Sequence, residues 1–154
     1  GYNYRLSELQ SALGIHQIKK VKYFLKIRKR NFEYLYKKLI NLKNLRILPS
    51  KYKYYEGSFY CMSIILNKKY KKHRKNIISL LNKKGIGTSI YYPQPVPRMS
   101  YYKKKYNYNK KLFKNSEEIS DCSICLPVGA HVSIEDCNYI IKIINAIFKN
   151  YEKN

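Results

Sequence analysis

The chain has 154 residues, 45% of them hydrophobic, so it can bury one core; this excludes a wholly disordered chain and two ordinary domains. Its formal charge of +23, from 32 Lys and Arg against 9 Asp and Glu, is typical of nucleic-acid-binding proteins. However, Lys outnumbers Arg 26 to 6 and is spread along the whole chain, whereas phosphate and base contacts favour the Arg fork, so we expect no specific nucleic-acid partner.

The first elements in chain order are a predicted loop and two helices. Residues 1–5 show no hydrophobic period, which predicts a loop. Ser7 and Gln10 have the spacing of a capping box, so we expect a helix to begin at Ser7. Gly14 weakens this helix, and a second helical pattern follows over residues 18–42 with Lys and Arg opposite its apolar face.

The middle of the chain alternates short strands with one helix. The predicted elements are, in order, an extended run (45–48), a turn region (50–57), a strand (58–66), a helix (72–84) and a second strand (86–91). Gly85 follows the helix directly, at the position where a left-handed residue commonly ends one.

The last third begins with a loop at residues 92–98, where three prolines prevent regular structure. It continues with a polar excursion (101–111), a short helix (113–120), a strand (123–126) and a last helix. Ser133 and Asp136 are spaced to cap that last helix. The whole order predicts a single α/β domain with a small sheet.

Neither end of the chain carries a membrane signal. No positive region precedes an apolar stretch at the start, so no signal peptide is evident. The longest apolar run, residues 140–148, is interrupted by Lys142 and is far shorter than the ~20 residues that a membrane span needs. We therefore expect a cytoplasmic protein without a membrane partner.

Three segments of the chain, taken together and in order, carry a family pattern. They are GYNYRLSELQSALG at 1–14, KGIGTSIYYP at 84–93, and Leu126-Pro127 followed by His131 and the helix start at 133–136. This pattern resembles the DegT/DnrJ/StrS-type sugar aminotransferases, a branch of the fold-type I enzymes that use pyridoxal 5'-phosphate (PLP). The resemblance covers essentially the whole chain.

The resemblance implies that residues 1–154 are the C-terminal small domain of such an enzyme, with a small, mainly antiparallel sheet flanked by helices. It implies also that residues 1–17 reach the active site of the other subunit of a homodimer. The lysine that binds PLP covalently belongs to an N-terminal domain that this chain is expected to lack. No catalytic residue is therefore carried over to this chain, which is expected to be inactive by itself.

Two residues of the first loop are expected to bind the cofactor. By resemblance, Asn3 and Arg5 hold the PLP phosphate of the partner subunit, and an amide with a planar guanidinium suits phosphate oxygens. The simpler alternative is that Asn3 makes a turn and Arg5 forms a surface ion pair.

Substrate-binding residues are expected around the proline-rich loop. By resemblance, Tyr91 and Tyr92 line the pocket for a nucleotide sugar, and Arg98 meets its diphosphate. Tyr91 has the alternative of packing in the sheet. His131 also matches a family position, where a structural role is favoured because no acid–base partner is evident.

The function that these features indicate is transfer of an amino group from glutamate to a nucleotide-linked keto-sugar, for surface polysaccharide or amino-sugar biosynthesis. Another interpretation is that the chain is a remnant that dimerises but has no activity. The sequence does not identify the sugar, its nucleotide or the carbon that is aminated.

A rival constellation is formed by Cys122, Cys125, His131 and Cys137, which come near the spacing of a zinc knuckle. With the basic charge, it would indicate a nucleic-acid-binding module. Both longer gaps exceed the knuckle's by one residue, and Cys125 and Cys137 fall in an apolar strand and a helix. Buried free cysteines in a reducing compartment account for all of them, so we expect no metal site.

Overall fold

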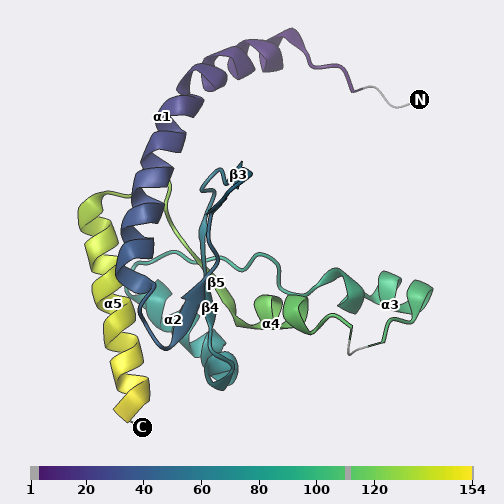
Figure 1. The fold of residues 1–154 in the computed structure, drawn as a ribbon. Helices are drawn as coiled ribbons and strands as arrows, with labels where there is room; N and C mark the ends of the chain where they lie inside the picture. The colour runs from purple at the N-terminus through teal and green to yellow at the C-terminus, as the bar shows by residue number, and fades with distance from the viewer. Residues whose placement is uncertain (1–3, 110–111, 154) are drawn as a thin grey trace.

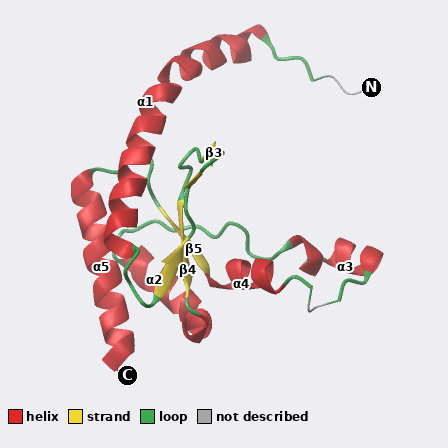
Figure 2. Ribbon diagram, viewed as in Figure 1, coloured by secondary structure: helices red, strands yellow, loops and turns green. Residues whose placement is uncertain are grey.

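The computed structural model describes residues 4–109 and 112–153. Its elements are α1 (Glu8–Leu39), β1 (Leu45–Ile47), β2 (Lys51–Tyr52), β3 (Tyr55–Glu56), β4 (Met62–Leu66), η1 (Lys68–His73), α2 (Arg74–Lys83), η2 (Val96–Arg98), α3 (Ser100–Tyr106), α4 (Lys114–Cys122), β5 (Ser123–Leu126) and α5 (Ile134–Lys153). The two η elements are 3-10 helices. Figures 1 and 2 show a small sheet between helices and a long first helix that extends away from it.

Helix α1 is continuous, where the sequence predicts two helices. That prediction was wrong because one helical glycine, Gly14, costs only about 1 kcal/mol relative to alanine. The predicted capping box is confirmed: the Ser7 N–H donates to Gln10 Oε1 at 3.1 Å, and the Gln10 N–H donates to Ser7 Oγ at 3.3 Å.

The two halves of α1 differ in burial. Near the end of the helix, Asn31, Phe32, Leu35 and Leu39 are buried in the domain. Residues 4–25, here called the N-terminal arm, extend away from the sheet (Figure 1). Apolar side chains of the arm are largely exposed, including Leu6 (73%), Leu9 (75%), Leu13 (59%), Ile18 (72%) and Val21 (44%). The apolar face predicted for residues 18–42 is therefore buried only in its second half.

The central sheet has the order β1-β4-β5 with both pairs antiparallel. Leu66 pairs with Leu45, and Ser63 pairs with Cys125. β4 and β5 are buried almost throughout, since helices cover both faces of the sheet. The predicted small antiparallel sheet flanked by helices is confirmed.

Helices α1 and α5 pack against each other beside the sheet, and α2 packs on α5. α4 lies on the other side of the sheet in Figure 1 and contacts β4. The core between them is formed mainly by aliphatic side chains, among them Leu35, Leu39, Ile64, Leu66, Ile77, Leu81, Ile124, Leu126, Ile140 and Ile144.

Three further sequence predictions need correction. Residues 86–91 are not a strand: only Ser89 pairs with the sheet, through a single bridge to Cys125. The turn region 50–57 contains the β2–β3 hairpin. The polar excursion at 101–111 contains α3, which ends at Asn107 in a left-handed conformation (φ 42°) that asparagine tolerates better than most residues.

The ends of α2 and α5 agree with their predicted signals. Gly85 follows α2 with a φ of 76°, which an L side chain rarely adopts. At the start of α5, the Asp136 N–H donates to Ser133 Oγ at 3.0 Å, and the Ser133 N–H donates to Asp136 Oδ2 at 2.8 Å. The predicted end of α2 and the predicted N-cap of α5 are both confirmed.

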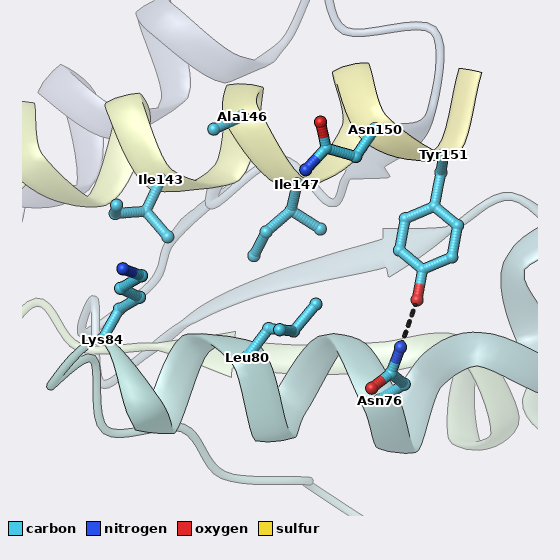
Figure 3. A pocket seen from close by; sticks show the side chains of 8 residues that line it. All are labelled: Asn76, Leu80, Lys84, Ile143, Ala146, Ile147, Asn150 and Tyr151. Atoms are coloured by element: carbon cyan, nitrogen blue, oxygen red, sulfur yellow. Dashed lines mark hydrogen bonds between the residues drawn. The ribbon is translucent and has the colours of Figure 1, made fainter. Parts of the chain in front are cut away.

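A groove of about 360 Å3 lies between α2 and α5 (Figure 3). Its floor is apolar, and at one end Asn76 Nδ2 donates to the Tyr151 hydroxyl at 2.8 Å. Of the residues predicted to bind cofactor or substrate, those that the structure describes all lie outside the groove lining. Among the described helices, none is both long and apolar enough to cross a membrane.

Candidate functional site

A cavity of about 210 Å3 brings together two of the predicted residues, Tyr91 and His131. It opens where α1, the segment before β4, the loop after α2 and the loop between β5 and α5 meet. Its lining is formed by Arg28, Tyr60, Cys61, Gly87, Ser89, Tyr91, Cys125, Leu126, Pro127, Val128, Gly129 and His131. We call this cavity the candidate site.

An aromatic pair and an arginine form one wall of the candidate site. The Tyr60 and Tyr91 hydroxyls are 3.4 Å apart, and their ring centroids are 5.8 Å apart. This hydrogen bond raises the pKa of Tyr60 above its ordinary value. The Arg28 guanidinium lies 5.6 Å from the Tyr60 ring centroid. Tyr91 is 40% exposed, so it lines the cavity and does not pack in the sheet.

Two cysteines and a serine line or adjoin the floor. Ser63 Oγ lies 3.2 Å from Cys125 Sγ and 3.8 Å from Cys61 Sγ. Hydrogen bonds from the Cys61 thiol and the Ser63 hydroxyl lower the pKa of Cys125, while burial opposes them. Sequence reasoning treated Cys125 as a buried hydrophobe and missed this polar contact, because cross-strand pairing with Ser63 has no local signal.

The cysteines and the histidine of the zinc-knuckle-like pattern do not form a common metal site among the described residues. Cys122 and Cys137 are buried in the hydrophobic core, whereas Cys125 faces the candidate site. Over residues 4–109 and 112–153, no three His, Cys, Asp or Glu side chains are placed to hold a metal ion. Burial raises the pKa of both Cys122 and Cys137, which is the behaviour of structural thiols.

Asn31 anchors the loop that forms the far wall. Its side chain is fully buried, and its Nδ2 donates to the carbonyls of Val128 (3.3 Å), Gly129 (3.3 Å) and Val132 (2.8 Å). Arg30 donates to Asn31 Oδ1 through Nε at 3.1 Å and Nη2 at 2.9 Å, which orients the amide. Sequence reasoning missed Asn31. The available signal was a polar residue four positions before Leu35 on the buried stripe.

Gly129 allows His131 to lie close to the backbone. A Cβ at position 129 would be 2.8 Å from His131 Cε1 and 2.9 Å from Nδ1. Gly129→Ala is therefore expected to displace the imidazole, with a loss of stability of at most about 1 kcal/mol because a side chain can move. We would follow the His131 ring resonances by NMR.

Gly87→Ala provides the matched control, because Gly87 lines the same cavity but a Cβ there meets nothing within 4 Å. This variant should leave the His131 resonances in place. Equal shifts in the two variants, or none in Gly129→Ala, would contradict the close approach.

Arg98 and Tyr92 do not line the candidate site. Arg98 binds Asp121 through two bonds of 2.6 and 2.9 Å and Glu117 through one of 3.2 Å. It lies beside a second cavity of about 380 Å3 with Tyr108 and Phe113. The guanidinium holds the pKa of Asp121 well below its usual range. Tyr92 is 71% exposed.

The two residues predicted to bind the cofactor are Asn3 and Arg5. Asn3 is outside the described residues. Arg5 is exposed and lies three residues before α1, in the N-terminal arm, which extends away from the sheet (Figure 1).

Comparison with known proteins identifies the family. A model described as the DegT/DnrJ/EryC1/StrS aminotransferase family matches residues 1–145, and the chain belongs to this family. It is 26% identical, over 99% of its length, to the UDP-4-amino-4,6-dideoxy-N-acetyl-beta-L-altrosamine transaminase of Helicobacter pylori, of which it covers 39%. Over 56% of its length it is 35% identical to the GDP-4-keto-6-deoxy-D-mannose 3-dehydratase of Escherichia coli O55:H7, of which it covers 21%.

The solved structure of Helicobacter pylori PseC, an aminotransferase involved in the biosynthesis of pseudoaminic acid, superposes with a TM-score of 0.85 at 25% identity. The superposition covers 97% of this chain and 39% of PseC. The chain thus spans about two fifths of the length of such relatives. The resemblance stated from the sequence, and the fold class that it implies, are both confirmed.

Proposed function

We propose that this chain is the C-terminal portion of a PLP-dependent aminotransferase that transfers an amino group from glutamate to a nucleotide-linked keto-sugar, for surface polysaccharide or amino-sugar biosynthesis. The observation that carries the proposal is the similarity of nearly the whole chain to a nucleotide-sugar transaminase. The enzyme acts as a homodimer in the cytoplasm, and the missing lysine belongs to a preceding domain.

PLP, when bound, supplies the electron sink on which amino-group transfer depends. The donor set of the first loop fits its phosphate, since a guanidinium and an amide can both donate to phosphate oxygens. Arg5 is exposed and belongs to the N-terminal arm, which extends away from the sheet and is therefore available to a second subunit (Figure 1). In this proposal Asn3 and Arg5 orient the cofactor of the partner.

The sugar substrate lies against Tyr91, which lines the candidate site and holds its hydroxyl near that of Tyr60. Tyr92, being exposed beside it, can close over the substrate. A contact between Arg98 and the diphosphate would require Arg98 to exchange Asp121 or Glu117 for the phosphate. Tyr91 is therefore the better supported of the three substrate residues.

A second candidate reaction is dehydration of a nucleotide-linked sugar, which the local 35% identity to a 3-dehydratase favours. The two named relatives act on different nucleotides and by different reactions. In this proposal the property common to both relatives and this chain is the binding of a nucleotide-linked sugar. The preceding domain then determines which reaction takes place. The mass of the product distinguishes the two reactions, because only transamination adds nitrogen.

The test uses the longest open reading frame that contains the chain. Asn3→Ala and Arg5→Ala are each expected to weaken PLP retention about tenfold or more, because each removes a hydrogen bond to a charged group. Lys22→Ala, on the exposed side of the arm, is the control and should retain PLP normally. PLP retention is measured by the absorbance of the cofactor that stays with the protein after gel filtration. Unchanged PLP retention in both first-loop variants would rule out the phosphate contact.

A further inference from the structure

Within residues 26–109 and 112–153, Arg28 differs from the other arginines because none of its N–H groups donates to an oxygen atom of a described residue. Arg30, Arg46, Arg74 and Arg98 each donate to an oxygen atom. The Nε of Arg28 is buried, and no hydrogen-bond partner for it exists among the residues that the structure describes. Arg28 nevertheless lines the open candidate site, so the remaining N–H groups of its guanidinium are suited to an acceptor from outside the chain.

The surroundings of Arg28 favour an anion. None of the described residues that line the candidate site is acidic. The carboxylates of Asp121 and Glu118 pair with basic groups elsewhere. Leu126, Pro127 and Val128 give the cavity an apolar wall, and the lower local dielectric strengthens the attraction between a guanidinium and an anion.

The geometry of Arg28 selects the kind of anion. Its guanidinium carbon lies 5.6 Å from the Tyr60 ring centroid, within the range of a cation–π contact. The N–H edge of a planar guanidinium donates in parallel pairs, which match phosphate and carboxylate oxygens. The cavity of about 210 Å3 is smaller than the ~300 Å3 at which ligand pockets begin, and it suits one such group.

We propose that the candidate site holds an oxyanion, a phosphate or a carboxylate, on Arg28. Ser89 and His131 line the same cavity and can donate further hydrogen bonds. The identity of the anion rests on the proposed function: it is the diphosphate of the sugar nucleotide or a carboxylate of the amino donor. The oxyanion site itself does not depend on transamination, and it is tested by binding alone.

The experiment titrates the uniformly 15N-labelled chain with pyrophosphate, UDP and glutamate in separate NMR series, at about 0.15 M salt to screen exposed lysines. We expect saturable shifts confined to the amides of Gly87, Ser89 and Gly129. Arg28→Gln should weaken this binding at least tenfold, and Arg28→Lys should weaken it less, because lysine keeps the charge without the fork. Response to pyrophosphate and UDP identifies a phosphate site, and response to glutamate alone identifies a carboxylate site.

Lys22→Gln is the matched control, since it removes the same charge from an exposed position of the same helix. It should leave the titration unchanged. The proposal is overturned if none of the three probes saturates at these amides, or if the shifts are scattered over the surface and survive in Arg28→Gln. Neither result would bear on transamination, which is measured separately by PLP retention and product mass.

Discussion

Replacing Asn31 by alanine is expected to lower the free energy of unfolding by about 2–4 kcal/mol, because three carbonyl groups lose a buried donor and a small cavity forms. The side chain is fully buried and bonds to Val128, Gly129 and Val132, which lie about a hundred positions further along the chain. Urea denaturation followed by circular dichroism measures the change.

Asn145→Ala serves as the control for Asn31→Ala. Asn145 is exposed and donates only within its own helix, to the carbonyl of Ile141. We expect its replacement to change stability by no more than about 0.5 kcal/mol. A loss below about 1 kcal/mol in Asn31→Ala would show that the loop of residues 128–132 is held by other contacts.

The second large effect is expected at Asp121, which binds Arg98 through two bonds and Lys71 at 2.7 Å. Asp121→Asn should cost about 1–2 kcal/mol at neutral pH, less than a fully buried pair because the Arg98 side chain is 34% exposed. The fold lowers the pKa of Asp121 from its ordinary 3.8. The stabilisation is therefore present above pH ~4 and is lost as pH falls through the folded pKa.

The measurement is a set of thermal unfolding curves of the wild type and Asp121→Asn between pH 7 and pH 2. The gap between the two should narrow below pH ~4, since the asparagine does not titrate. Glu56→Gln, which breaks the exposed pair of Lys29 and Glu56, should give a much smaller gap at every pH. A gap for Asp121→Asn that stays constant with pH would contradict an electrostatic origin.

Much of the fold follows from local signals. The Ser7–Gln10 and Ser133–Asp136 spacings are contacts within one helical turn, so their consequences can be read without tertiary information. The strand at residues 123–126 and the helix before Gly85 were also predicted from patterns within their own segments. The strand predicted for residues 86–91 was wrong because a strand needs a neighbouring strand to pair with. Within this segment only Ser89 pairs, with Cys125. Branched side chains alone do not supply that neighbour.

The candidate site was harder to predict because it is assembled from distant segments. Tyr91 and His131 were found through a family pattern, whereas Arg28, Asn31 and Ser63 belong to no short motif. Their roles arise when α1 crosses the loop after β5 and when β4 pairs with β5. Arg98 was expected beside a diphosphate because it follows a rigid loop. Its pairing with Asp121, over 20 positions away, could not be read from that loop.

The N-terminal arm also has a mechanical consequence. α1 is held in the domain by four buried residues near its end, and about 24 residues separate Phe32 from Glu8, a length of about 36 Å. A tilt of about 5° where the helix is held would carry its start by about 3 Å, roughly the length of a hydrogen bond. Small changes in the packing of Leu35 and Leu39 are therefore expected to produce larger displacements at Arg5, beyond the other end of the helix.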